Sequence, residues 1–183
     1  MTWQQHHRAT VLTAPRLAVH LDQVTQPDGQ RGEVWVTEQP DGALIVPVDD
    51  RGRVGMVRSV TYVHGEVVTP PGGTVEPGES PVEAGQRELC EEAGITAREW
   101  TPLGSVALMT RNTARLHFFL ATGLSLGEQQ LTGSEAGMTL EWWDLPEAVE
   151  AACDGRLTLS GASLGILMAA RHLAKSEENG RQP

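Results

Sequence analysis

Alternating apolar and polar residues predict strands in the first sixty positions. Two short runs of this kind, 16–25 and 33–37, are separated by a turn-rich segment and predict an N-terminal β-hairpin. A second hairpin is predicted where the runs 43–48 and 54–57 flank the turn-forming residues 49–52. Both runs of this second hairpin are expected to lie in a central sheet.

A helix signature begins at Ser80. Ser80 is a suitable N-cap, Pro81 stands at the first helical position, and Glu83 stands where a capping box needs it. Gly94 has the residue type that ends helices in a left-handed conformation. The pattern therefore predicts a helix over residues 81–93.

The remainder of the chain mixes strand and helix patterns. The segment 123–137 has no periodicity and is expected to be a long loop, and such loops are often functional. Strand-like runs lie at 104–109, 116–121 and 138–143, and helical runs lie at about 146–153 and 162–174. The order predicts an α/β protein.

Length and composition favour one core with elaborations. The chain has 183 residues, of which 39% are hydrophobic, enough for one sizeable core but too few for two ordinary domains. We expect an N-terminal β extension over residues 1–40, a main domain over 41–175, and a disordered tail over 176–183.

The net charge of the chain bears on which classes of partner it can bind. Fourteen Lys and Arg against 24 Asp and Glu give a formal charge of −10, which disfavours nucleic acid and anionic membrane as partners. An anionic substrate would need divalent cations to supply positive charge. Neither a membrane-spanning run nor a signal peptide is evident, so a cytoplasmic protein is expected, with Cys90 and Cys153 reduced.

Three glutamates in the predicted helix carry the chemical signal. Glu88, Glu91 and Glu92 stand at i, i+3 and i+4, so their carboxylates share one helix face. Like charges at this spacing repel one another, and a cation among them would reverse that effect. Hard oxygen ligands select Mg²⁺, with Mn²⁺ as the alternative. The pattern thus indicates metal-assisted hydrolysis of a phosphoanhydride, whereas a generic Glu-rich helix would be only a solvated face.

The surrounding residues decide between these interpretations. The stretch 73–95 matches every specified position of the Nudix box, Gly-x5-Glu-x7-Arg-Glu-U-x-Glu-Glu-x-Gly-U, where U is a bulky aliphatic residue. The chain therefore resembles the Nudix hydrolases. This resemblance implies an α/β/α sandwich with a mixed sheet, in which the box forms a loop, a helix and a loop.

The resemblance also implies residue roles. Glu88 and Glu92 would be the principal metal ligands, and Glu91 a further ligand or a group that helps to activate water. The backbone carbonyl of Gly72 would bind metal as well. Glu79 and Arg87 would form an ion pair that braces the loop of the box.

Outside the box, the chain is most similar to the ADP-ribose and ADP-sugar pyrophosphatase branch. This branch usually has an arginine near Thr61, a glutamate near Thr69 and a Pro-Gly pair near residues 110–112, and this chain lacks all three. In the same branch an extra catalytic glutamate lies roughly where this chain has Glu135, although an ordinary loop acid is the alternative. In this branch the N-terminal hairpin typically exchanges contacts between subunits, so the resemblance implies a homodimer.

Three further residues are candidates for substrate binding. Trp35 could stack on a nucleobase, although core packing is the favoured interpretation. Arg58 and Arg111 could clamp a phosphate through paired guanidinium bonds, whereas each alone is more often a surface residue.

These observations predict a Nudix enzyme that cleaves a nucleoside diphosphate linked to another group. One alternative is an enzyme for nucleoside triphosphates or dinucleoside polyphosphates. Another is a nucleotide-sensing module without turnover, which the complete set of box glutamates disfavours.

Overall fold

The chain forms two compact units. A computed structural model describes residues 2–180. The first unit contains Met1–Asp41 together with Val106–Leu116, and the second contains Gly42–Ser105 and His117–Pro183. The sequence placed a boundary at residue 40 but did not associate residues 106–116 with the N-terminal extension.

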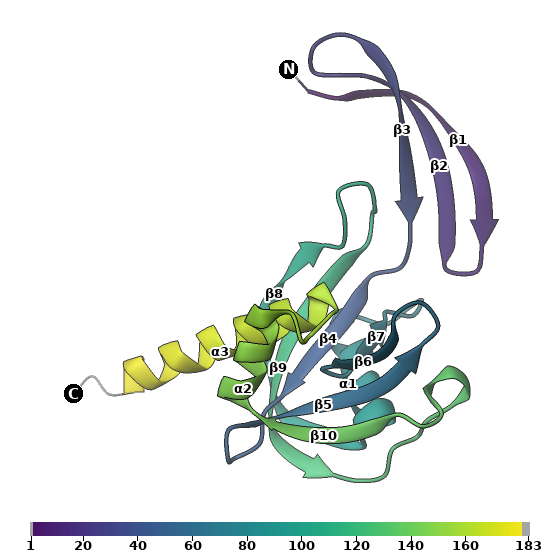
Figure 1. The fold of residues 1–183 in the computed structure, drawn as a ribbon. Coiled ribbons are helices and arrows are strands. Elements are labelled where there is room, and N and C mark those ends of the chain that lie inside the picture. The colour runs from purple at the N-terminus through teal and green to yellow at the C-terminus, as the bar shows by residue number, and fades with distance from the viewer. Residues whose placement is uncertain (1, 181–183) are drawn as a thin grey trace. The chain divides into compact units, whose positions relative to one another are not determined.

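The first unit is built on an antiparallel sheet of three strands, where the sequence predicted a two-stranded hairpin. Strands β1 (Gln4–Ala14), β2 (Leu17–Thr25) and β3 (Arg31–Glu38) lie in the order β1-β2-β3 (Figure 1). The pattern missed β1 because all eleven of its residues are exposed, so none of its positions has to be apolar.

The segment 106–116 joins the first unit through polar contacts. The Thr37 amide donates to the Arg111 carbonyl at 2.9 Å. The buried Asn112 side chain donates to Thr37 Oγ1 at 2.9 Å and to Gln39 Oε1 at 2.6 Å. Since these partners lie some 75 positions apart in the chain, no local pattern could reveal them.

The strands of the second unit are β4 (Gly42–Pro47), β5 (Arg53–Thr61), β6 (Gly65–Thr69), β7 (Gly72–Thr74), β8 (Ile95–Ala107), β9 (Arg115–Leu126) and β10 (Thr139–Asp144). They form two sheets, of order β7-β4-β9-β8 and β10-β5-β6. The two runs of the predicted second hairpin are strands, but they lie in different sheets, so the expectation that they share a sheet is wrong. An isolated antiparallel bridge joins Val48 to Val54.

Helices cover both faces of β4. A side chain on Gly85 of α1 (Pro81–Ala93) would lie 3.2 Å from Ile45, so that residue faces α1. Its neighbours Leu44 and Val46 lie against Gly165 of α3 (Ser160–Gly180), because successive strand residues point to opposite faces. The expected α/β/α architecture is confirmed, with α2 (Leu145–Asp154) packing beside α3.

Two predicted boundaries differ from the structure. Strand β9 continues to Leu126, and residues 133–135 form a short 3₁₀ turn, so the loop of 123–137 is shorter than expected. Helix α3 continues to Gly180, beyond the expected start of a disordered tail at 176. Residues 181–183 of that predicted tail lie outside the described residues. None of the helices within 2–180 has the length and hydropathy to cross a bilayer.

Candidate active site

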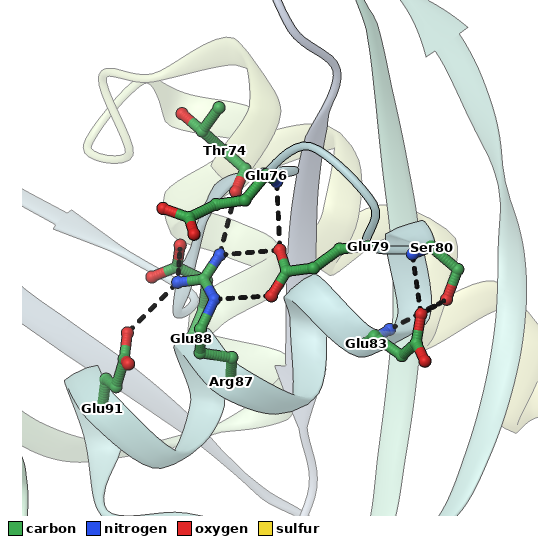
Figure 2. A network of polar contacts seen from close by, with 8 residues as sticks. All are labelled: Thr74, Glu76, Glu79, Ser80, Glu83, Arg87, Glu88 and Glu91. Atoms are coloured by element: carbon green, nitrogen blue, oxygen red, sulfur yellow. Dashed lines mark hydrogen bonds and ion pairs between the residues drawn. The ribbon is translucent and has the colours of Figure 1, made fainter.

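Local chemistry fixes both ends of the glutamate-bearing helix. The Ser80 amide donates to the Glu83 carboxylate at 2.8 Å, and the Glu83 amide donates back to Ser80 Oγ at 3.4 Å (Figure 2). Gly94 ends the helix at φ 64°, a left-handed conformation that favours glycine. The predicted start and end of α1 are therefore confirmed.

Arg87 connects the helix to the loop before it. Its guanidinium donates to both oxygens of Glu79, at 2.8 and 3.1 Å, and to the Thr74 carbonyl at 3.0 Å (Figure 2). These hydrogen bonds lower the pKa of the Glu79 carboxyl. The expected ion pair is thus present, and it fastens both ends of the loop 74–79 to α1.

The same guanidinium also contacts two of the three helix glutamates. Arg87 Nη1 donates to Glu88 at 2.8 Å and to Glu91 at 3.1 Å (Figure 2). The Glu88 side chain is 9% exposed and that of Glu91 is 37% exposed. Burial raises the pKa of Glu88, and Arg87 partly opposes that effect. The two glutamates are therefore bonded to the same guanidinium group but differ in their access to water.

Glu92 is buried, and its carboxylate accepts a hydrogen bond from the backbone of β7. The Gly72 amide donates to Glu92 Oε2 at 2.8 Å. Burial raises the pKa of Glu92 to about 8; the Gly72 amide opposes the shift, and the charges of Glu88, Glu135 and Glu91 add to it. A buried acid among other acids is an arrangement that costs free energy unless a cation is present.

Two glycines make room for these carboxylates. A Cβ on Gly73 would lie 2.2 Å from a Glu88 oxygen, and one on Gly72 would lie 2.4 Å from the Ala43 carbonyl. Strand β7 can therefore approach α1 and β4 only because it lacks side chains here. Gly73 is a functional residue that the sequence pattern did not single out, although its place as the first glycine of the box was the available signal.

The donor set suits a hard divalent cation. Glu88, Glu91, Glu92 and the Gly72 carbonyl offer only oxygen ligands, and burial raises the pKa of both buried carboxylates even though Arg87 is bonded to Glu88. In the part of the chain that the structure describes, no three acidic, His or Cys side chains already converge as a metal centre. Glu88 and Glu91 are instead hydrogen-bonded to Arg87.

The structure brings Glu135 to the same group of acids. Burial is the main cause of the raised pKa of Glu88 and of Glu92, and the negative charge of Glu135 adds to both shifts. Its own carboxylate accepts a hydrogen bond from the Thr132 amide at 3.1 Å and is partly buried. A residue 43 positions after Glu92 in the sequence therefore belongs to the same electrostatic cluster.

Of the three candidate substrate-binding residues, Trp35 and Arg111 belong to the first unit and Arg58 to the second. Trp35 is on β3 and 49% exposed, so the favoured interpretation as a core residue is wrong. Arg58 is held by Glu141 and by Glu66, the latter at 2.6 Å. Arg111 lines a cavity of about 430 Å³ within the first unit, together with Trp3, Gln5, Asp22, Val24, Val34 and Thr110.

Comparison with known proteins agrees with this geometry. The model of the NUDIX domain matches residues 38–158. An ADP-ribose pyrophosphatase of Mycobacterium tuberculosis is 32% identical over 164 residues, covering 86% of this chain and 78% of the relative. A CMP-5'-(N-acetyl-N-hydroxy-3-aminopropyl)phosphonate hydrolase of Streptomyces rubellomurinus is 31% identical over 171 residues, covering 91% and 82%.

A solved structure described as an ADP compounds hydrolase shares the fold. It superposes with a TM-score of 0.83 over 96% of both chains, at 20% sequence identity. The family match covers more than half of the chain, and it includes the loop and helix that hold the glutamates. The chain belongs to the Nudix family of hydrolases. Within that family it groups by sequence with ADP-ribose pyrophosphatases.

Proposed function

We propose that this enzyme uses Mg²⁺, or Mn²⁺, to hydrolyse the phosphoanhydride of a nucleoside diphosphate linked to another group. The observation that carries the proposal is the burial of Glu88 and Glu92 beside Gly72, with two more acids close by. Such a cluster repels an anionic pyrophosphate unless divalent cations intervene. The bound cation would neutralise the pyrophosphate and favour a nucleophilic water.

The residues of the cluster divide this work. Glu88 and Glu92 would hold the cation together with the Gly72 carbonyl, and Glu91, the most exposed of the three, would be a further ligand or would accept a proton from water. Arg87 would keep Glu88 and the loop 74–79 in register through its bonds to both. Glu135 would add a carboxylate from the turn before β10, outside the Nudix box.

The substrate class rests on the relatives. The two relatives above 30% identity are named for ADP-ribose and for a CMP-linked phosphonate, each a nucleotide joined to another group. Thr61 and Thr69 replace the charged residues expected for ADP-ribose, and the loss of charged partners typically costs a few kcal/mol of discrimination. We therefore propose a substrate of the ADP-ribose or nucleotide-sugar type, whose terminal group need not be plain ribose.

Two residues of the first unit remain candidates for substrate binding. Trp35 offers an exposed aromatic face for a base, and Arg111 lines a cavity of suitable size. Arg58 would have to leave Glu66 and Glu141 before it could bind a phosphate, so its sequence-based role is the weakest of the three.

A substrate panel tests this proposal. ADP-ribose, other nucleotide sugars, CMP conjugates and the common triphosphates would be compared by kcat/KM, with Mg²⁺, with Mn²⁺ and in excess chelator. We expect the highest value for a nucleotide-diphosphate conjugate, with nucleoside monophosphate among the products and no turnover in chelator. Best hydrolysis of a triphosphate with release of pyrophosphate would refute the substrate class, and full activity in chelator would refute the role of the cation.

We further propose a cytoplasmic homodimer that acts on small nucleotides, without nucleic acid or membrane as partners. The negative net charge and the two free cysteines, Cys90 and Cys153, support this setting.

A further inference from the structure

The segment after β9 contacts the C-terminal end of α1. We call residues 127–131 the α1 strap. The Gly127 amide donates to the Gly94 carbonyl at 2.6 Å, and the Gln130 amide donates to the Glu91 carbonyl at 2.8 Å. The Gln129 side-chain amide donates to the Glu92 carbonyl. The last carbonyls of a helix lack partners within the helix, so the strap supplies donors to the turn that carries Glu91 and Glu92.

Gly94 lets the strap come this close. A Cβ on Gly94 would lie 2.8 Å from the carbonyl carbon of Glu128 and 2.8 Å from the carbonyl oxygen of Gly127. The last glycine of the box therefore has two functions, since it ends α1 at positive φ and also leaves space for the strap backbone.

The strap leads directly to Glu135. On either side of the segment 132–137, Leu131 and Met138 pack in the hydrophobic cluster that contains Leu89 and Ala93 of α1. Between these anchors the Glu135 amide donates to the Thr132 carbonyl at 3.0 Å, which closes a compact turn. Both ends of the turn with Glu135 are thus fixed to the helix with Glu88 and Glu92.

We propose that Gln129 is a positioning residue, whose bond from the strap to the Glu92 carbonyl holds the 132–137 turn so that Glu135 faces the glutamates of α1. The inference rests on the proposed function, because it takes Glu135 to be part of the active site. It gives a role to a residue outside the Nudix box that never has to touch the substrate.

The turn with Glu135 is joined to α1 at its two ends. Within the turn, the Thr132 amide donates to the Glu135 carboxylate at 3.1 Å and the Glu135 amide donates to the Thr132 carbonyl at 3.0 Å, while Leu131 and Met138 pack on either side of it. A turn that is fixed only at its ends depends on those ends for its position. Removal of one fixed point should therefore disturb Glu135 more than the helix, which keeps its own hydrogen bonds.

The test is a double-mutant cycle. Gln129→Met keeps the size of the side chain and removes the donor, and we expect kcat to fall about tenfold with little change in KM, as small displacements at active sites do. In a Glu135→Gln background the same substitution should change kcat less than about twofold, because its target is already lost. Glu128→Gln, an exposed neighbour in the strap, is the matched control and should leave kcat unchanged.

Hydrogen exchange gives a readout that does not depend on turnover. Gln129→Met should speed exchange of the amides in 132–138 and leave those of 84–90 unchanged, whereas Glu128→Gln should change neither. Equal falls in kcat in both backgrounds, wild-type kcat in Glu135→Gln, or unchanged exchange in 132–138 would each overturn the inference. An enzyme inactive on the whole substrate panel would instead refute the proposed function, and the exchange result would still decide whether the strap holds the turn.

Discussion

Glu92 shows at the scale of one residue how function and stability oppose each other. Its carboxylate is buried at 8% exposure, and burial with the nearby acids raises its pKa to about 8. A residue chosen for stability alone would be neutral at this position, because the folded protein otherwise has to bury a charge near other charges of the same sign. The arrangement is therefore typical of a site that is completed by a cation.

The substitution Glu92→Gln tests whether function and stability oppose each other at this position. The amide keeps an oxygen for the Gly72 donor but loses the ligand charge, so turnover with Mg²⁺ should fall at least about a hundredfold. In chelator, the thermal midpoint should equal or exceed that of the wild type, because the amide spares the folded protein the cost of burying a carboxylate or of taking up a proton to neutralise it.

Steady-state kinetics and calorimetry measure the two effects separately. Glu150→Gln, which makes the same change at an exposed position of α2, should leave activity intact. A Glu92→Gln enzyme with wild-type turnover would remove Glu92 from the proposed site.

Strand β1 shows how a strand without buried residues can be attached to its sheet. It is attached to β2 by backbone pairing from Gln4 to Ala14 and by one ion pair, in which Arg8 donates to both oxygens of the buried Asp22 at 2.7 and 2.8 Å. The hydrogen bonds from Arg8 lower the pKa of Asp22, and burial opposes them only in part. The edge of this sheet is thus fastened by polar contacts rather than by a core.

This ion pair predicts a dependence on pH. Because the pKa of Asp22 is lower in the folded state, its contribution to stability is present above the unfolded value of about 3.9 and is lost as pH falls through the folded value. Asp22→Asn should therefore lower the thermal midpoint at pH 7, and the difference from wild type should shrink below about pH 4. Asp50→Asn, at an exposed turn position, serves as the control, and a pH-independent difference for Asp22→Asn would contradict the linkage.

Several large apolar side chains are exposed to solvent when the protein is a monomer. In the first unit Val11, Leu12 and Trp35 are 56%, 47% and 49% exposed. Large apolar side chains exposed in this way are typical of protein interfaces, and a three-stranded sheet has little core of its own. These observations support the homodimer that the resemblance implies.

Sedimentation at micromolar concentration should therefore give a dimer, and a Val11→Asp/Leu12→Asp variant should shift it towards monomer. Removal of residues 1–40 should raise KM more than it lowers kcat, because the glutamate cluster lies wholly in the second unit. A wild-type profile that is monomeric throughout would count against the assembly.

The sequence by itself determined the features that depend on short-range chemistry. The capping box at Ser80, the stop at Gly94 and the bracing pair of Glu79 and Arg87 all lie within fifteen positions of one another, where side chain and backbone select the local structure directly. The box motif combined these residues with Glu88, and it therefore identified both the helix and the chemistry.

Tertiary structure decided everything that depends on long-range contact. The pairing of exposed β1, the separation of β4 and β5 into two sheets, and the docking of 106–116 are set by partners far along the chain. The difference in burial between Glu91 and Glu92 has the same origin, since β7 approaches only one side of α1. Periodicity reports which side of an element is apolar, but it contains no information on which neighbour covers that side.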